Sequence, residues 1–384
     1  MSVTEAAVRS ALETVDEPEL RMPVTALGLV QGIAVDGSTV VVAIAEPLPD
    51  RGTWGALEAS VREAVLAVDG VERVDVDVRE MDEDELPAVA RVLKGEPPPN
   101  PLAVVDAQAA AQQPPRARVN PFTDSRTRVL AIASGKGGVG KSSVTTNLSI
   151  ALAQRGKRVA VVDADVWGFS LPRMMGVARP PDLIDDVIVP PDAHGVRVIS
   201  MGFFTREDEA VVWRGPMLHK ALEQFLTDVH WAEPDYLVID LPPGTGDVSL
   251  SIAQFLPRAE VVIVTTPQPA AQKVASRAGA MAAKVNLDVV GIIENMSWFT
   301  ADDGTRYELF GEGGGAELAA KLDVPLLGQV PLVPALREGG DAGVPIILAA
   351  PDDEASVVFR TMAERLDTEL VPSRRSHPEL RISP

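Results

Sequence analysis

The segment Ser134-Gly135-Lys136-Gly137-Gly138-Val139-Gly140-Lys141-Ser142-Ser143 decides the fold of this chain. It contains the pattern Gly-x-x-x-x-Gly-Lys-Ser, which is typical of a loop that binds phosphate groups. A β-type run at residues 129–133 precedes it, and an amphipathic stretch at residues 142–155, predicted to be helical, follows it. A plain glycine-rich turn would also join a strand to a helix, but that alternative leaves the lysine unexplained. The order of strand, loop and helix therefore predicts a nucleotide site.

Each residue type in this loop has a chemical reason to be there. Glycines adopt backbone dihedrals that other residues resist, so successive N–H groups can face a phosphate, and the positive end of the following helix adds to the attraction. In this pattern the lysine, Lys141, reaches the β- and γ-phosphates, and the hydroxyl of Ser142 ligates Mg²⁺. Ser143 is expected to bond to the α-phosphate. The predicted ATP-binding residues are Gly135, Lys136, Gly137, Gly138, Val139, Gly140, Lys141, Ser142 and Ser143.

A repeated rhythm of short β-branched runs and helical stretches extends from residue 127 to about residue 370. The runs occupy residues 129–133, 158–162, 196–200, 236–239, 261–264, 289–293 and 325–328. Continuous apolar strands separated by helices predict an α/β fold, a mostly parallel sheet with helices on both faces. Ligands of such sheets bind beyond the carboxyl ends of the strands. The residues that directly follow each strand are therefore the candidates for the site.

Acidic residues follow two of these predicted strands. Asp163 and Asp165 come after the second run, where two carboxylates could serve a cation or a water molecule, or form a capping turn. Asp240 ends the run at residues 236–239, as expected of an acid delivered toward Mg²⁺. The loop at residues 241–247 has two prolines and two glycines, which favours a switch with two positions over a rigid turn.

A second lysine, Lys136, stands at the start of the loop. The sequence Gly-Lys-Gly-Gly-Val-Gly-Lys-Ser resembles the deviant Walker A motif of the MinD, ParA, ArsA and nitrogenase iron-protein group. This resemblance implies a homodimer in which Lys136 reaches across to the partner's nucleotide. It also implies that Asp165 positions the attacking water, that Asp163 holds a water of the Mg²⁺ shell, and that Asn295 reads the adenine. Lys136, Lys141 and Asp165 are thus the expected catalytic residues, and Ser142, Asp163 and Asp240 the expected metal residues.

Further motifs resemble those of the Mrp/ApbC family. They are Trp-Arg-Gly-Pro-Met at residues 213–217, Glu-Asn-Met-Ser-Trp-Phe at 294–299 and Phe-Gly-Glu-Gly-Gly-Gly at 310–315, in a match that runs from about residue 129 to residue 348. Asp-Glu-Pro-Glu-Leu at 16–20 and Leu-Gly-Leu-Val at 27–30 resemble the small domain often fused to such proteins. The resemblance implies slow, Mg²⁺-dependent ATP hydrolysis that serves iron–sulfur cluster assembly or transfer.

The chain departs from that family at the cluster ligands. The family has a Cys-x-x-Cys pair after the Trp/Tyr-Phe segment, whereas this chain contains no cysteine and continues with Thr-Ala-Asp-Asp-Gly at residues 300–304. Glu46-Pro47 also stands where the small domain often has Cys-Pro. An iron–sulfur cluster ligated by cysteines of this chain is therefore excluded. We expect Asp302 and Asp303 to lie in a solvated loop.

Composition shifts divide the chain into four parts. Residues 1–95 are predicted to form a small α/β domain, with helices at 3–15 and 56–68, a hairpin of strands at 29–35 and 39–45, and a strand at 71–78. Residues 96–126 are rich in proline and alanine and are expected to be a linker, or else a strap on the main domain. Residues 127–370 form the predicted ATPase domain, and residues 371–384 a flexible tail.

Charge limits the partners. The formal net charge of −20 opposes binding to nucleic acid and to anionic membranes, and the chain shows neither a secretory signal nor an apolar run long enough to span a bilayer. The chain is expected to be cytoplasmic and to serve protein clients that its sequence does not identify. Two other functions stay open: a nucleotide-switched regulatory or positioning ATPase like MinD or ParA, and a scaffold that binds ATP and hardly hydrolyses it.

Overall fold

The computed structural model describes residues 3–50, 52–96, 120–123, 125–166, 168–204, 215–244 and 247–372. Most of the predicted linker and nearly all of the predicted tail lie outside these residues, so their description stays a prediction. The chain divides into two compact units. One comprises residues 1–122, 179–192 and 220–233, and the other comprises residues 123–178, 193–219 and 234–384. The sequence analysis did not predict that two segments from within residues 127–370 would group with the N-terminal residues.

The N-terminal unit is built on a three-stranded sheet. Strand β3 (Val30–Asp36) pairs antiparallel with β4 (Thr39–Glu46), and β4 pairs parallel with β5 (Arg73–Glu80). The predicted hairpin and the third strand are thus confirmed, as are the two helices, α1 (Glu5–Leu12) and α2 (Trp54–Leu66). Helix α3 (Leu86–Leu93) and the short strands β1 (Asp16–Glu17) and β2 (Met22–Pro23) were not predicted.

Alternation along β4 explains the core of this unit. Val40, Val42 and Ile44 point to one face of the sheet and are buried, as expected of a half-buried strand. The inserted hairpin of β8 (Asp182–Ile184) and β9 (Val187–Val189) adds Ile184, Val187 and Val189 to the same apolar cluster. This contribution explains why residues 179–192 group with the N-terminal unit.

The second unit is built on an eight-stranded sheet of order β10-β11-β7-β12-β6-β13-β14-β17. Its strands are β6 (Arg128–Ser134), β7 (Val159–Asp163), β10 (Asp192–Ala193), β11 (Val196–Ser200), β12 (Tyr236–Asp240), β13 (Glu260–Thr265), β14 (Asp288–Asn295) and β17 (Leu326–Val330). Every pairing from β11 to β17 is parallel. All seven predicted runs are strands of this sheet, so the predicted α/β class is confirmed.

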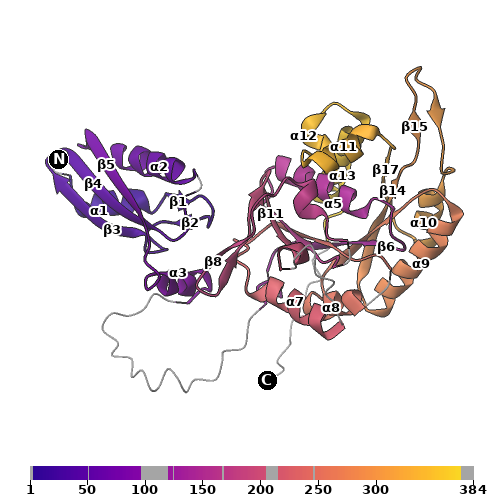
Figure 1. The fold of residues 1–384 in the computed structure, drawn as a ribbon, viewed down its shortest axis with the longest axis horizontal. Coiled ribbons are helices and arrows are strands. Elements are labelled where there is room, and N and C mark those ends of the chain that lie inside the picture. Colours follow the sequence, from indigo (N-terminus) through magenta and orange to yellow (C-terminus); the bar gives the residue numbers. More distant parts are fainter. Residues whose placement is uncertain are drawn as a thin grey trace, which may run out of the picture. The chain divides into compact units, whose positions relative to one another are not determined.

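Helices cover both faces of this sheet (Figure 1). Helices α5 (Lys141–Gln154), α11 (Pro334–Ala342), α12 (Ile346–Ala349) and α13 (Glu354–Thr368) lie on one face, and α8 (Asp247–Phe255), α9 (Pro269–Lys284) and α10 (Gly314–Leu322) lie on the other. The remaining elements are α6 (Leu171–Met174), η1 (Met201–Phe204), α7 (Gly215–Thr227), β15 (Phe299–Thr300) and β16 (Arg306–Tyr307). No helix of the described residues is long and apolar enough to span a membrane.

Helix α5 differs from its prediction in one respect. The sequence analysis treated it as amphipathic, but every residue from Val144 to Leu152 is buried. The reason is that α5 packs on the sheet with one side, while α12 and α13 pack against its other sides. Because the helix is enclosed on all sides, its small polar residues, such as Thr145 and Ser149, are buried too. The prediction of amphipathicity is therefore wrong, and the prediction of the helix is confirmed.

The strand order determines where the site lies. Strand β6, which carries the phosphate loop at its carboxyl end, lies between β12 and β13. Strand β12 in turn pairs with β7, and the register places Asp240 directly opposite Asp163. Because these strands are parallel, the loops that follow β6, β7 and β12 leave the sheet at the same edge.

Candidate nucleotide site

The phosphate loop spans residues 135–140, between β6 and α5. Gly138 and Gly140 both have φ of +77°, a left-handed conformation that residues with a side chain rarely adopt. Gly135 lies so close to helix α9 that a Cβ atom would come within 2.7 Å of the carbonyl oxygen of Val274. A Cβ on Gly140 would collide with the side-chain amide of Asn295. The loop thus needs glycine for its conformation at two positions and for close packing at two.

Four polar side chains meet where β12 ends and α5 begins. The Nζ atom of Lys141 and the hydroxyl of Ser142 each lie 2.6 Å from Oδ2 of Asp240. The hydroxyl of Thr145, one helical turn further on, donates to Oδ1 of Asp240 at 2.6 Å. Asp240 is fully buried and the side chain of Lys141 is only 6% exposed. The structure therefore brings three of the predicted site residues together, with Thr145 as a fourth member.

Asp165 approaches the same cluster from β7. Its Oδ2 lies 3.9 Å from Nζ of Lys141, and its Oδ1 accepts a hydrogen bond from the backbone N–H of Gly168 at 3.2 Å. The side chain is mostly buried. Asp165 thus holds its own loop with one oxygen and faces the lysine with the other. Trp167, two residues after Asp165, lies outside the described residues.

Asp163 organises the loop after β7. Its Oδ2 accepts hydrogen bonds from the backbone N–H groups of Ser170 and Leu171 and from the hydroxyl of Ser200, and Oδ1 accepts one from the N–H of Asp165. Burial, and then the nearby Asp240 carboxylate, raise the pKa of Asp163 to about 7. Both oxygens are thus engaged within the loop, and a role for Asp163 in the Mg²⁺ shell stays a proposal.

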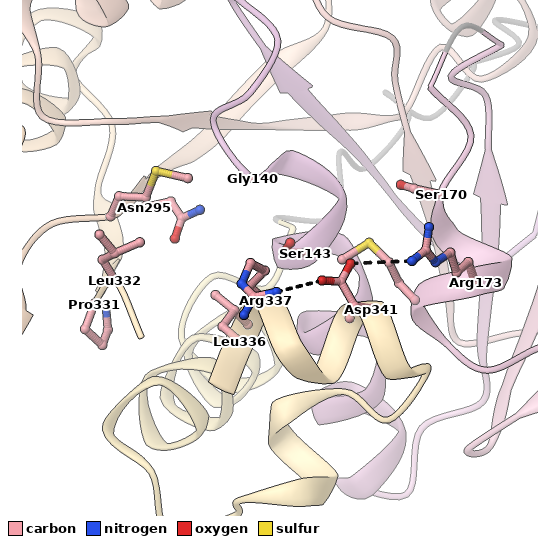
Figure 2. Close-up of a pocket in the computed structure, with 13 residues that line it drawn as sticks. Gly140, Ser143, Ser170, Arg173, Asn295, Pro331, Leu332, Leu336, Arg337 and Asp341 are labelled. Carbon is pink, nitrogen blue, oxygen red and sulfur yellow. Dashed lines mark hydrogen bonds and ion pairs between the residues drawn. The ribbon is translucent and has the colours of Figure 1, made fainter. Parts of the chain in front are cut away.

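A cavity of about 420 Å³ opens beside the phosphate loop, and Figure 2 shows its lining. Gly140 and Ser143 line it on one side and Asn295 on the other. The remaining lining residues come from the loops after β7, β14 and β17 and from helices α6 and α11: Ser170, Arg173, Met174, Met296, Pro331, Leu332, Leu336, Arg337, Gly340 and Asp341. Such a cavity, largely apolar and next to a phosphate loop, suits a nucleoside.

Asn295 supplies one defined polar atom to this cavity. Its Nδ2 donates to the carbonyl of Val139 in the phosphate loop at 2.9 Å. Its Oδ1 is buried and has no hydrogen-bond partner among the described residues. A buried acceptor without a partner carries a free-energy cost that a ligand N–H group would remove. The orientation of the amide thus favours a base that presents a donor.

Arg337 lines the cavity from helix α11. Its guanidinium pairs with Oδ2 of Asp341 at 3.0 Å, and Arg173 approaches Oδ1 of the same carboxylate at 3.7 Å (Figure 2). All three side chains are exposed. Exposed pairs of this kind contribute little to stability, so the bonds leave the rim free to rearrange around a ligand.

The loop after β12 is hydrogen-bonded to the end of β6, next to the phosphate loop. The N–H of Gly244 donates to the carbonyl of Ser134 at 2.9 Å, and Gly244 has φ of +98°. Residues 245–246 lie outside the described residues, so the predicted switch stays a prediction.

The hairpin of β15 and β16 contains residues 300–304, where the resemblance to the Mrp/ApbC family implies a Cys-x-x-Cys pair and this chain has none. Its base contacts α13 through Glu354. The carboxylate of Glu354 accepts a hydrogen bond from the indole N–H of Trp298 at 3.3 Å and forms an ion pair with the guanidinium of Arg306 at 2.5 Å. At its tip, Asp303 accepts from the N–H of Thr305, which lowers the pKa of the Asp303 carboxyl. Asp302 and Asp303 are exposed, as predicted for a solvated loop.

A separate acidic pair lies inside the N-terminal unit. Glu46, the last residue of β4, is 1% exposed, and neither of its carboxyl oxygens has a hydrogen-bond partner among the described residues. Glu17 is buried beside it and accepts from the N–H of Leu20. Burial, and then the Glu17 carboxylate, raise the pKa of Glu46 to about 8. The folded chain therefore holds the proton of Glu46 more tightly than a solvated glutamate does.

Sequence reasoning missed two residues near the phosphate loop. Thr145 stands four residues after Lys141, the spacing that places both on one face of a helix, so this signal was available. Gln268 follows β13, and its Oε1 lies 3.4 Å from Nζ of Lys136. No pattern along the chain connects these two positions, since only the parallel pairing of β6 and β13 brings them together.

Comparisons with known proteins identify the families that the two parts of the chain resemble. Residues 125–367 match the family described as ParA, NUBPL iron-transfer P-loop NTPase, and residues 5–78 match the family described as iron-sulfur cluster assembly protein. A solved structure of a nucleotide-binding protein in complex with ADP, from Archaeoglobus fulgidus, is 35% identical with a TM-score of 0.52. The match covers 60% of this chain and 91% of that chain.

Two relatives match over nearly their whole length. The iron-sulfur cluster carrier protein of Mycobacterium tuberculosis is 46% identical over 373 residues, which is 94% of this chain and 93% of the relative. That of Deinococcus radiodurans is 41% identical over 363 residues, which is 94% of each. With the phosphate loop, the Asp240 cluster and the cavity beside them, these matches show that the chain belongs to the Mrp/ApbC family of iron–sulfur cluster carriers, nucleotide-binding P-loop ATPases of the ParA type.

Proposed function

We propose that this chain is a homodimer that binds and slowly hydrolyses ATP with Mg²⁺, and that it assists iron–sulfur cluster assembly or transfer without ligating the cluster through cysteines of its own. The convergence of Lys141, Ser142 and Asp240 within hydrogen-bond distance carries this proposal. A cation for the phosphates, a hydroxyl and a carboxylate are the groups that phosphoryl transfer requires at one point.

The adenine base is proposed to occupy the cavity next to the loop. Its exocyclic amine would donate to Oδ1 of Asn295, the acceptor that has no other partner. The amide nitrogen is already bonded to Val139, so Asn295 offers an acceptor rather than a donor. This arrangement favours adenine over a base that carries an oxygen at the same position.

The residues present fit a magnesium ion. Ser142 and Asp240 provide hard oxygen atoms beside the loop, as Mg²⁺ prefers. No group of three or more acidic, histidine or cysteine side chains among the described residues is arranged to hold a metal, which suits an ion that takes its other ligands from phosphates and water. When bound, Mg²⁺ would supply charge neutralisation of the phosphates. Asp240 would then hold the ion and Lys141 would be free to contact the phosphates.

We propose catalytic roles for Lys141, Asp165 and Lys136. Lys141 stabilises the charge on the phosphates, and Asp165, whose Oδ2 faces Lys141, orients the attacking water. Lys136 of one subunit approaches the nucleotide of the other, which limits hydrolysis to the dimer. The iron–sulfur role rests on the relatives and on the N-terminal match, and the client protein supplies the cluster ligands because this chain has no cysteine.

Phosphate release and sedimentation test the proposal. We expect Lys136→Ala, Lys141→Ala and Asp165→Ala each to lower the rate of ATP hydrolysis by at least about tenfold, and we expect the native chain to sediment as a dimer with ATP. Equal rates in all four proteins would refute the assigned site. A monomer with and without ATP would refute the role of Lys136.

Anaerobic reconstitution tests the cargo. The purified chain, mixed with iron and sulfide, is expected to hold no stable cluster, because thiolates are the ordinary ligands of such clusters. The visible absorption spectrum after desalting reports the result. A cluster that survives desalting would show that other side chains ligate it.

A further inference from the structure

The ammonium group of Lys136 forms a hydrogen bond within its own chain. Its Nζ lies 3.4 Å from Oε1 of Gln268, and the hydroxyl of Thr266 donates to the same oxygen at 2.7 Å. Both Lys136 and Gln268 are partly buried, and Thr266 is buried. No ion pair to Lys136 occurs within the described part of the chain. The amide oxygen of Gln268 is thus the group that receives this ammonium.

The contacts of Gln268 favour a role in binding Lys136 over a role in capping helix α9. It is the N-cap residue of α9, yet its side chain makes no capping hydrogen bond to that helix. Instead its amide oxygen is oriented by Thr266 toward the phosphate loop. The N-terminus of a helix carries partial positive charge, which disfavours a cation near it. The bond to Gln268 therefore holds Lys136 weakly, so that it can be released.

We propose that Gln268 is a positioning residue that retains Lys136 in its own subunit, so that this bond must break before Lys136 enters the nucleotide site of a partner. This inference rests on the proposed dimer. A lysine bonded to Gln268 cannot reach a second chain at the same time. The apparent affinity of the dimer is consequently reduced by the fraction of chains in which Lys136 is held.

Chemical labelling tests the holding bond without requiring a dimer. The full-length chain without nucleotide is treated with trace acetic anhydride, and acetylation of Lys136 is measured by peptide mass spectrometry. We expect Gln268→Ala to raise the labelling rate of Lys136 about threefold, since the long hydrogen bond to the ammonium is lost, and Gln268→Glu to lower it because a carboxylate binds the ammonium more strongly. Gln272→Ala is the matched control, because Gln272 bonds to the carbonyl of Pro267 at the same helix end. Labelling of Lys136 that is equal in all four proteins, or changed as much by the control, would overturn the inference.

Sedimentation with ATP and Mg²⁺ then tests the consequence. Gln268→Ala is expected to tighten the dimer by about threefold to tenfold, and Gln268→Glu to weaken it. If the native chain forms no dimer with ATP, the proposed function fails while the labelling result stands. If the native chain dimerises and both variants match it, the gating role of Gln268 fails while the proposed function stands.

Discussion

The Nζ of Lys141 lies 2.6 Å from Oδ2 of Asp240, so the lysine of the phosphate loop and the acid at the end of β12 neutralise each other in a buried setting. Ser142 donates to the same oxygen and Thr145 to the other. We infer that binding of ATP with Mg²⁺ would exchange these partners: the ammonium would pair with a phosphate, and the carboxylate would hold the metal.

Replacement of Asp240 by asparagine tests this exchange. Asp240→Asn keeps the size of the side chain but removes the charge, so we expect Mg²⁺-dependent hydrolysis to fall on the order of 100-fold. Phosphate release at several Mg²⁺ concentrations measures it. Thr145→Ser, which retains the hydroxyl, serves as the control and should keep most of the activity. A native rate in Asp240→Asn would contradict the metal role.

Two glycines of the phosphate loop provide a matched pair for stability. Gly138 and Gly140 share φ of +77°, so alanine at either position costs about 1–2 kcal/mol of unfolding free energy for the backbone alone. A Cβ on Gly138 meets nothing within 4 Å, whereas one on Gly140 collides with the amide of Asn295. Urea unfolding should therefore show Gly140→Ala to be less stable than Gly138→Ala by a further ~1–3 kcal/mol. Equal losses would mean that Asn295 moves away at no cost.

Asn295 should govern the choice of base. ATP and ITP differ at the purine 6-position, where ATP has an amine and ITP an oxygen, so the buried Oδ1 of Asn295 gains a donor only from ATP. If the base contacts Oδ1 through its 6-position, we expect the native chain to bind ATP about tenfold more tightly than ITP, and Asn295→Ala to lose most of this preference. Calorimetric titration with each nucleotide measures this. An unchanged preference in Asn295→Ala would place the base elsewhere.

Glu46 should make the stability of the N-terminal unit depend on pH. Its folded pKa of about 8 lies above the ordinary value of 4.5, so the folded state holds the proton more tightly. The stabilisation is complete below pH 4.5 and is lost as pH rises toward 8, at about 1 kcal/mol per pH unit. Urea unfolding between pH 5 and about pH 8 should show this loss in the native chain and not in Glu46→Gln.

The control for this measurement is the neighbour of Glu46 across the sheet. Glu80 lies opposite Glu46 in the pairing of β4 with β5, and its side chain is exposed. Glu80→Gln should therefore keep the pH dependence of the native chain. A pH dependence that survives in Glu46→Gln would assign it to another group.

Much of the fold followed from local patterns. The β-branched runs predicted seven of the eight strands of the large sheet, all except β10, and the glycine–lysine pattern predicted the loop at residues 135–140. These signals are strong because a buried parallel strand must be apolar on both faces, and because a phosphate loop needs glycine at set positions. The hairpins β8–β9 and β15–β16 were missed because two or three residues per strand carry too little pattern.

By itself, the sequence determined that this chain holds a phosphate loop, ends its central strands in carboxylates and contains no cysteine. These properties depend on residue type and on spacing within one strand or loop. The tertiary structure alone decided which groups meet: Lys141 with Asp240, Lys136 with Gln268, and Asn295 with Val139. Those contacts join residues separated by 99, 132 and 156 positions. Strand order and register create them, and no periodicity along the chain records that order.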